Sequence, residues 1–443
     1  MRNILLLGAG RSSSALIQYL LEHASEDGYH LTVNDLSAEL ATEKTGNHSS
    51  STAVSFDIHN DILRVEALKK CDLVISLLPP SLHIVVAHDC VSLGRHLITA
   101  SYITNEISAL HSESVKKKIL LLNECGLDPG IDHMSAVEII NRLKKEGAEI
   151  TSFKSYTGGL IAPEYIDNPW GYKFTWNPRN VIIAGQGTAK YIQNGKYHYI
   201  PYHRLFTQLE KISIEGYGRY EGYANRDSLA YRKQYGISDI PTLIRGTLRG
   251  QNFCSAWNVF VQIGLTDDTY VIEDSEHLTY AQLVESMLTD NNTSLPLANR
   301  IAFLCQLPIN SAEISMIQST GILDNTVIGL VKVTPAQILQ HLLESKWQLK
   351  ENDHDMIIMH HLFEYRINNK LKKLSSSLIV KGENQKITAM AKTVGYPLGI
   401  VGRLLLKGKI NLSGVVIPVL PEIYIPVLEE LKKLKIEFVE RDL

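Results

Sequence analysis

Cysteine is scarce in this sequence, and so are the other features that would assign it to a special class. Five cysteines are scattered over 443 residues without a CxxC motif, so the sequence indicates neither a zinc site nor a disulfide framework and favours a reducing compartment. The formal net charge is −3, and without a basic surplus nucleic acid is not an expected partner. Apolar runs stay below the ~18 residues that span a bilayer. The N-terminal run breaks at Gly8 and lacks a signal cleavage site. We expect a soluble, cytoplasmic protein without a membrane partner.

Hydrophobic residues make up 44% of the chain and charged residues 21%, which is enough to bury a sizeable core. The length indicates two or three domains. Within residues 1–124, short apolar runs alternate with helical segments. We expect strands at 3–7, 30–34, 73–78, 96–100 and 119–122, and helices at 14–22, 62–69, 82–91 and 107–116. This pattern is typical of a doubly wound α/β fold with a buried parallel sheet, which binds ligands beyond the carboxyl ends of its strands.

The remaining chain has a different character. Residues 125–285 are rich in aromatics and glycines and predict a mixed sheet with long loops, whereas 286–350 has helical periodicity. Strands are expected at 356–366 and 375–380, and a last helix at 422–434. The apolar stretch 387–406 predicts a helix that is kinked or restarted at Pro397. Because this stretch must be covered and the N-terminal sheet needs helices on both faces, we expect it to pack on residues 1–124.

A glycine turn follows the first expected strand and precedes a helix, as a dinucleotide site requires. Gly8 would permit the tight turn, and Gly10 would let the backbone approach a pyrophosphate. Ser13 replaces the third glycine, and an ordinary turn between strand and helix remains the alternative. Asp35 ends the second strand, where a carboxylate binds the ribose 2′-hydroxyl and repels a 2′-phosphate. It favours NAD over NADP, although Arg11 could meet a phosphate and Asp35 could merely cap a helix.

Several longer strings resemble the saccharopine dehydrogenase/reductase family, in its L-glutamate-forming branch. They occur in the family's order over nearly the whole chain, at residues 75–79, 99–103, 126–134, 155–160, 168–169, 172–176, 225–228, 245–249 and 390–395. The resemblance implies a variant Rossmann domain built from residues 1–124 with 387–443. It also implies an α/β substrate and dimerisation domain of residues 125–285 with 351–386, and a small helical insert at 286–350. A homodimer is implied as well.

The same resemblance implies an NAD(P)-dependent oxidoreductase of lysine metabolism. It would oxidise saccharopine to L-glutamate and 2-aminoadipate 6-semialdehyde, or run in reverse. Because of Asp35, NAD is the preferred coenzyme and NADP a second option. The implied cofactor contacts are Gly8, Gly10, Arg11, Ser12, Ser13, Asp35, Leu36, Asp57, Ile58, Leu77, Leu78, Ala100, Ser101, Leu127 and Trp176. Two departures stand out. Residues 11–13 are unlike the family's usual sequence, and Thr157 stands where the family commonly has cysteine.

Saccharopine carries three carboxylates, so its site needs cationic donors, and arginine matches carboxylates with two parallel hydrogen bonds. By resemblance, the substrate contacts are Ser101, Tyr102, Asp128, Arg226, Thr247, Leu248 and Arg249. Solvated arginines, or arginines paired with Asp227 and Glu221, are the alternative, and Arg245 is ambiguous. Asp128 is the candidate base and Tyr102 the second catalytic candidate. Asp128 before Pro129 also predicts a helix N-cap, and Tyr102 could be a packing aromatic.

A metal is not expected, since hydride transfer needs none. His360 and His361 would point to opposite faces of a strand, which also argues against a site with His354. Asp132 and His133 are expected to support the site rather than ligate a metal. Two other functions remain open: a related imine-reducing dehydrogenase of the carboxynorspermidine type, and an inactive nucleotide-binding regulator.

Overall fold

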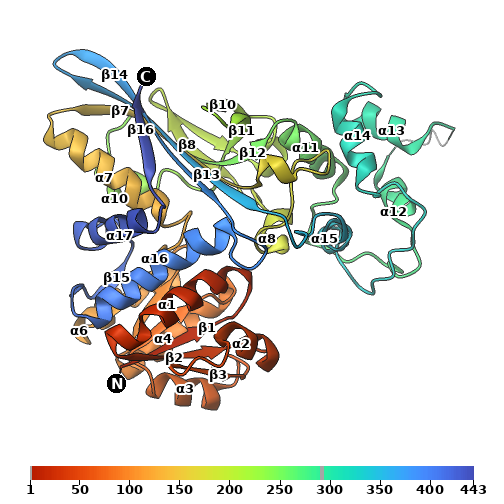
Figure 1. The fold of residues 1–443 in the computed structure, drawn as a ribbon. Helices are drawn as coiled ribbons and strands as arrows, with labels where there is room; N and C mark the ends of the chain where they lie inside the picture. The colour runs from red at the N-terminus through yellow and green to blue at the C-terminus, as the bar shows by residue number, and fades with distance from the viewer. Residues whose placement is uncertain (1, 290–293) are drawn as a thin grey trace. The chain divides into compact units, whose positions relative to one another are not determined.

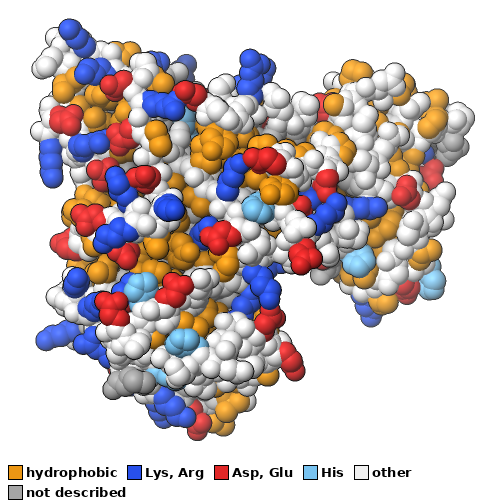
Figure 2. Space-filling view, in the orientation of Figure 1, with side chains coloured by type: hydrophobic (Ala, Val, Ile, Leu, Met, Phe, Trp, Pro, Cys, Tyr) orange, Lys and Arg blue, Asp and Glu red, His pale blue; other side chains and the backbone are white. Residues whose placement is uncertain are grey.

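The computed structural model describes residues 2–289 and 294–443. The chain forms two compact units (Figure 1). Unit 1 contains Met1–Ile150, Asp355–Met359 and Tyr365–Leu443, and unit 2 contains Thr151–His354 and His360–Glu364. No helix in the described ranges is long and apolar enough to cross a membrane, and the cytoplasmic location stays a prediction. Acidic and basic side chains are interspersed over the face drawn in Figure 2, in keeping with the small net charge.

Unit 1 is built on a seven-stranded sheet in the order β15-β6-β5-β4-β1-β2-β3. Every neighbouring pair is parallel, which confirms the predicted variant of the Rossmann fold. The central strands are almost entirely buried, as expected where helices cover both faces. The strands are β1 (Arg2–Leu7), β2 (Tyr29–Asn34), β3 (Ser51–Val54), β4 (Leu73–Ser76), β5 (His96–Thr99), β6 (Leu120–Leu122) and β15 (Gly414–Val416).

The C-terminal segment completes unit 1. Helix α16 (Ala389–Leu406) packs on α1 (Ser14–Asp27) through two glycines. A Cβ on Gly395 would lie 2.9 Å from the Leu16 backbone nitrogen, and one on Gly399 would lie 2.7 Å from a ring carbon of Tyr19. The contact confirms the predicted packing of this segment on residues 1–124. Pro397 lies inside a single helix, so a restart, one of the two predicted alternatives, is wrong, and the kink stays a prediction. The division into three domains stays a prediction.

The other helices of unit 1 differ from the predictions at several points. α2 and β3 were not predicted, and the expected helix at 107–116 is two short helices. Helix α7 begins at Ile131 with Gly130 as N-cap residue, so the predicted N-cap role of Asp128 is wrong. The helices are α2 (Ala38–Thr45), α3 (Asp61–Lys69), α4 (His83–Leu93), α5 (Asn105–Ala109), α6 (His111–Lys116), α7 (Ile131–Lys145) and α17 (Pro421–Lys433), with 3-10 turns η1 (Arg11–Ser13) and η2 (Pro80–Leu82).

The second sheet is mixed, as predicted, with strand order β10-β11-β12-β7-β13-β14-β16; β8 pairs with β12 and β9 with β8. β12 runs parallel to β7 and antiparallel to β11. Its strands are β7 (Glu149–Ile161), β8 (Ala189–Gln193), β9 (Lys196–Ile200), β10 (Glu210–Ile214), β11 (Gly218–Ala224), β12 (Thr242–Gly250), β13 (Asp355–Ile367), β14 (Lys370–Lys381) and β16 (Phe438–Asp442).

Helices in unit 2 enclose an aromatic core. Trp170, Trp257 and Trp347 are each buried in it, and the Trp170 ring stacks on Phe260 with centroids 5.5 Å apart. Residues 290–293 of the expected insert at 286–350 lie outside the described residues. The helices are α8 (Pro178–Ile182), α9 (Tyr202–Leu205), α10 (Tyr231–Gln234), α11 (Phe253–Ile263), α12 (Tyr280–Met287), α13 (Leu297–Leu304), α14 (Ala312–Ser319) and α15 (Pro335–Lys346), with the 3-10 turn η3 (Pro163–Tyr165).

Candidate functional site

The glycine turn after β1 has the geometry that a dinucleotide needs. Gly8 has φ +98°, and a Cβ there would lie 3.2 Å from the Leu77 carbonyl oxygen. Its N–H donates to the Asn34 carbonyl at 2.8 Å. Gly10 is exposed, and nothing lies within 4 Å of the position a Cβ would take. The turn therefore leaves its backbone open to a ligand.

The start of α1 offers backbone donors. Neither η1 nor α1 has a side-chain cap in the described structure, so no capping side chain competes with a ligand for the backbone N–H groups of these first turns. Arg11 is exposed and Ser12 partly buried at this turn. Ser13 is fully buried, and its hydroxyl donates to the Gly10 carbonyl at 2.8 Å. Serine thus fills the small-residue position predicted for it, and the turn fits a pyrophosphate.

Asp35 binds the protein's own backbone. One carboxylate oxygen accepts from the Ala9 N–H at 2.8 Å and the other from the Ser37 N–H at 3.1 Å. These bonds link the end of β2 to the glycine turn. Leu36 beside it is 74% exposed. The carboxylate holds the turn in place, and its predicted contact with a ribose stays a prediction.

Asn34 was missed by the sequence predictions, although a polar residue ending a buried strand is a usable signal. Its side chain accepts from the Phe56 N–H at 2.9 Å and donates to the Phe56 carbonyl at 3.3 Å. It thereby fixes the segment after β3 that carries the predicted contacts Asp57 and Ile58. Asp57 is exposed and Ile58 is buried. Leu77 and Leu78, also predicted, follow β4 and are partly buried.

A buried histidine connects the ends of β4 and β5. His83 is 1% exposed, and its Nδ1 lies 2.9 Å from the Ser76 hydroxyl. Its Nε2 lies 2.8 Å from the Ser101 hydroxyl and 3.2 Å from that of Thr99. Burial lowers the pKa of His83 to about 4, so the ring is neutral at physiological pH. No sequence motif pointed to this residue.

The two catalytic candidates lie in contact. The Tyr102 hydroxyl donates to Asp128 Oδ1 at 3.1 Å, and both residues are partly buried. Asp128 lies in a closed loop, in which the Gly126 N–H donates to the Pro129 carbonyl at 2.9 Å. A Cβ on Gly126 would lie 2.8 Å from that of Ala100. The loop therefore requires glycine and holds the predicted contacts Ala100 and Leu127 beside the pair.

Three buried ionisable residues support these loops. Glu124 accepts from the Ile103 N–H at 3.0 Å, and its other oxygen lies 2.8 Å from His133 Nε2. Asp132 accepts from the Gly130 N–H at 2.6 Å and lies 3.5 Å from His133 Nδ1. Glu124, Asp132 and His133 are each at most 1% exposed. The supporting role predicted for Asp132 and His133 agrees with these contacts; Glu124 was missed.

Unit 2 contains a buried arginine without an acidic partner. Arg249 on β12 is 4% exposed, and its guanidinium lies 5.4 Å from the ring centroids of both Tyr172 and Phe253. Nη1 donates to the Leu248 carbonyl at 3.3 Å, whereas Nε has no partner. Within the described ranges, no carboxylate forms an ion pair with it. A buried charge without a counter-ion is costly, so this position favours an anionic ligand.

The acidic residue opposite Arg249 in the sheet accepts hydrogen bonds from backbone N–H groups instead of pairing with the arginine. Glu221 lies opposite it on β11, but its carboxylate accepts from the backbone N–H groups of Asn252 and Cys254 at 2.8 and 3.1 Å. The sequence-based alternative that Glu221 neutralises Arg249 is therefore wrong.

Further polar groups share this face of the sheet. Thr247 is paired in register with Tyr223 on one side and Thr157 on the other, and it lies two residues before Arg249, on the same face. The Thr157 hydroxyl is buried and has no partner in the described part of the chain. Leu248 points to the opposite face and is fully buried. Of the contacts predicted on β12, Thr247 and Arg249 therefore share one face of the sheet, and the side chain of Leu248 does not.

The other predicted residues of unit 2 lie in different surroundings. Arg226 is exposed, with φ +52°, and its neighbour Asp227 forms an ion pair with Lys190 at 3.2 Å. Arg245 is buried, and its guanidinium lies 4.2 Å from the Tyr231 ring centroid. Trp176, a predicted cofactor contact, is partly buried against the aromatic core.

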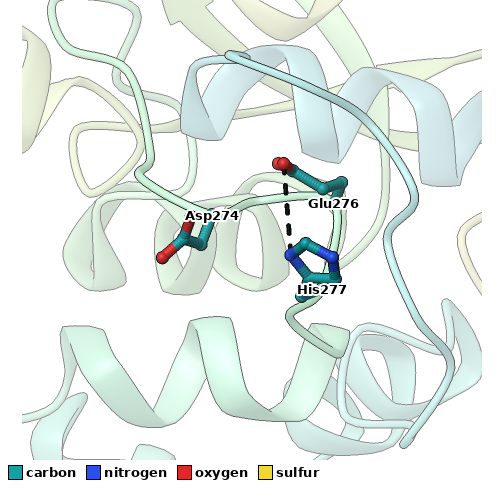
Figure 3. Close-up of side chains that lie close together, drawn as sticks. All are labelled: Asp274, Glu276 and His277. Carbon is teal, nitrogen blue, oxygen red and sulfur yellow. Dashed lines mark ion pairs between the residues drawn. The ribbon is translucent and has the colours of Figure 1, made fainter.

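One group of potential metal ligands lies in a loop of unit 2. Asp274, Glu276 and His277 offer ligand atoms within 4.8 Å of one another (Figure 3). The His277 side chain is 81% exposed, and its contact with Glu276 is 4.0 Å long. Exposed acidic groups of this kind are common without a metal, and nothing else in the loop indicates one. The three histidines considered from the sequence lie in other surroundings: His354 stacks on Tyr165, His360 is buried, and His361 Nδ1 lies 3.0 Å from the Ser155 hydroxyl.

Comparison with known proteins identifies both halves of the chain. The family model described as "Saccharopine dehydrogenase NADP binding domain" matches residues 4–122. That described as "Saccharopine dehydrogenase C-terminal domain" matches residues 126–436. Neither description supports the preference for NAD predicted from Asp35.

Individual relatives agree with these matches. The saccharopine dehydrogenase [NADP(+), L-glutamate-forming] of Saccharomyces cerevisiae is 32% identical, over 97% of this chain and 97% of its own length. An apo structure of the L-Glu forming saccharopine dehydrogenase from the same yeast superposes with a TM-score of 0.89 at 30% identity, covering 100% of both chains. The alpha-aminoadipic semialdehyde synthase of Arabidopsis thaliana is 32% identical over 99% of this chain, which covers only 44% of that relative's length.

Proposed function

The chain belongs to the saccharopine dehydrogenase family, a family of oxidoreductases, and we propose that it is an L-glutamate-forming saccharopine dehydrogenase. The reaction converts saccharopine, NADP⁺ and water into L-glutamate, 2-aminoadipate 6-semialdehyde, NADPH and a proton, or runs in reverse. The names of the yeast relatives support this substrate. The curated semialdehyde synthases are about twice as long as this chain, so any second activity of theirs is not proposed here.

The observation that carries the proposal is the buried guanidinium of Arg249. Saccharopine brings three carboxylates, and one of them would supply the counter-ion that the described residues do not. The aromatic faces of Tyr172 and Phe253 hold the guanidinium without neutralising it. Its unpartnered Nε would donate to the ligand. The buried Thr157 hydroxyl and Thr247 on the same sheet face would add neutral donors.

The nucleotide would be held by the turn at Gly8 and Gly10 and by the uncapped start of α1. The chemistry that the bound nucleotide would supply is acceptance of a hydride from the substrate carbon next to the secondary amine. Asp128 would take up the amine proton that must leave first, and the Tyr102 hydroxyl, which donates to Asp128, would keep the carboxylate oriented. Water then adds to the resulting iminium carbon, and the carbinolamine collapses to the amine of glutamate and the aldehyde.

For the coenzyme we propose NADP(H), which replaces the preference predicted from the sequence. The matching family description and the yeast relatives' names support it. One carboxylate oxygen of Asp35 accepts from the Ala9 N–H and the other from the Ser37 N–H. These hydrogen bonds lessen the repulsion between Asp35 and a 2′-phosphate. Arg11 is exposed at the same turn and could approach that phosphate. The predicted homodimer stays a prediction.

The decisive experiment measures NADPH formation from saccharopine by absorbance, in the wild type and in Arg249→Lys. Lysine keeps the charge but loses the planar fork, so KM for saccharopine should rise about 10- to 150-fold, the equivalent of a charge-assisted hydrogen bond of 1.5–3 kcal/mol. NADPH binding, measured by fluorescence, should stay unchanged. Arg219→Lys, at an exposed position on β11, is the control.

Absence of turnover with saccharopine in the wild type would reject the proposal. Turnover of another imine-forming amine would then favour the related dehydrogenase, and nucleotide binding without any turnover would favour the regulator.

A further inference from the structure

Ser76, His83 and Ser101 form a chain of hydrogen-bonding contacts in which the imidazole lies between the two hydroxyls. Ser76 ends β4 and Ser101 follows β5, and these strands are parallel neighbours with Ser76 in register with Thr99. The carboxyl ends of such strands face the ligand crevice of a doubly wound fold. Ser76 is 0% and His83 1% exposed, whereas Ser101 is only partly buried. The imidazole thus connects an inaccessible hydroxyl to an accessible one.

Counting hydrogens decides which ring nitrogen carries the proton. A neutral imidazole has one donor and one acceptor nitrogen. If Nδ1 accepts from the Ser76 hydroxyl, then Nε2–H donates to Ser101, and both short contacts, 2.9 and 2.8 Å, become hydrogen bonds. Only the Thr99 hydroxyl hydrogen then lacks an acceptor.

The other tautomer fits worse. With the proton on Nδ1, the Ser76 hydroxyl hydrogen has no acceptor, although Ser76 is fully buried. The single lone pair of Nε2 must then choose between Ser101 and Thr99. If Nε2 accepts from Thr99, the 2.8 Å contact between Nε2 and the Ser101 oxygen contains no hydrogen. If Nε2 accepts from Ser101, the hydroxyl hydrogens of Ser76 and Thr99 both lack an acceptor among these contacts. Buried polar groups are rarely left in either condition.

We infer that His83 is a positioning residue: it donates from Nε2 to Ser101, so that the Ser101 hydroxyl keeps its own hydrogen for an acceptor oxygen of the bound ligand. That oxygen belongs either to the nicotinamide carboxamide of the coenzyme or to a carboxylate of the substrate, and the second identity rests on the proposed function. The chain of contacts ends at a buried hydroxyl, so it orients Ser101 and carries no proton to solvent.

The tautomer can be read directly from the protein. In the full chain labelled with ¹⁵N-histidine, the resonances of His83 are identified by their loss in His83→Gln. A protonated Nε2 and a bare Nδ1 at neutral pH are expected. A protonated Nδ1 would overturn the inference. The measurement does not depend on which reaction the enzyme catalyses.

Two isosteric variants test the function of the donor. The amide of glutamine reaches the position of Nε2 and that of asparagine the position of Nδ1, so His83→Gln should retain activity within about threefold. His83→Asn should lose about tenfold, the value of one hydrogen bond to a charged or strongly polar group. Equal activity of the two variants would overturn the inference. Thermal melting of both variants separates this loss from unfolding.

A double-mutant comparison links His83 to Ser101. Ser101→Ala should lose about as much as His83→Asn, and the two together no more than either alone. If the loss of activity in the double variant equals the product of the two single losses, the residues act independently, which would contradict the inference. A rise in the NADPH dissociation constant identifies the coenzyme as acceptor, and a rise in KM or a fall in kcat for saccharopine identifies the substrate. If the wild type fails to turn over saccharopine, the proposed function falls, while the tautomer still decides the inference.

Discussion

At the scale of single residues, the polar groups that matter most are those whose partners are distant in sequence. Asp35 was predictable because a carboxylate after a second strand belongs to a known spacing. His83 was not, because a lone histidine in an apolar segment has no pattern. Its role depends on Ser76 and Ser101 meeting across two strands. Arg249 was found through its motif, but its lack of a counter-ion required the structure, since Glu221 is its direct neighbour in register.

The charge of Asp35 should control the choice between coenzymes. Asp35→Asn removes the negative charge and keeps one acceptor oxygen for the turn. The ratio of NADH to NADPH dissociation constants should therefore rise, by up to about tenfold for one screened charge of ~1 kcal/mol. Fluorescence titration of both coenzymes measures it, and the wild type should already bind NADPH more tightly. Tighter binding of NADH by the wild type would restore the original sequence prediction.

The buried His83 should make unit 1 sensitive to acid. Its pKa is lowered to about 4 by burial, from an unfolded value near 6.5. The unfolded chain therefore binds a proton first as pH falls, so stability is complete above pH ~6.5 and is lost toward pH 4. The loss should reach about 2 kcal/mol at pH 5.

Comparing denaturant unfolding at pH 7 and pH 5 tests this. His83→Gln should remove that share of the pH dependence, whereas His88→Gln, which changes an exposed histidine on the same helix, should leave it intact. His360, also buried with its pKa lowered to about 4, adds a separate contribution that both variants retain. Identical pH dependence of the wild type and His83→Gln would contradict the lowered pKa.

At the scale of elements, the sequence predicted those strands that are buried on both faces of the sheet. The strands β1, β4, β5 and β6 are continuous apolar runs because both faces of the sheet are covered. The edge strand β3 and the three-residue β15 were missed, since short or half-exposed strands carry no such run. The N-cap prediction for Asp128 failed because the loop from Gly126 closes on Pro129 and delays the helix to Ile131.

The crossing of α1 and α16 should tolerate no side chain at its closest point. Gly395→Ala would place a Cβ 2.9 Å from the Leu16 backbone, which cannot move without shifting α1. A loss of about 1–3 kcal/mol is expected. Gly402→Ala, on the same helix, meets only the ends of the Leu73 and Ile75 side chains, at 3.1 and 3.4 Å, and should cost less. Helix propensity favours alanine over glycine by about 1 kcal/mol at both positions, so a difference between the variants reports the crossing. Thermal unfolding of the pair measures it, and equal changes in stability would contradict the role assigned to the crossing.

At the scale of the whole molecule, unit 1 is assembled from both ends of the chain. A fragment of residues 1–124 lacks α16 and β15, and therefore exposes the apolar surface of α1 and the edge of β6. It should be insoluble or unable to bind NADPH. A fusion of residues 1–124 to 387–443 through a flexible linker is the matched comparison and should recover part of the binding. A soluble fragment 1–124 with full affinity would refute this dependence.

The pairing of β15 with β6 also sets an order of events during synthesis. Leu120–Leu122 leave the ribosome long before Gly414–Val416 exist. At about 5–20 residues per second the nascent chain waits tens of seconds with this edge unpaired. Unpaired sheet edges recruit other strands, so we expect the growing polypeptide to require protection by chaperones until β15 emerges. A premature stop codon ahead of Gly414 would leave that edge open permanently, and its product should aggregate rather than persist as a shortened enzyme.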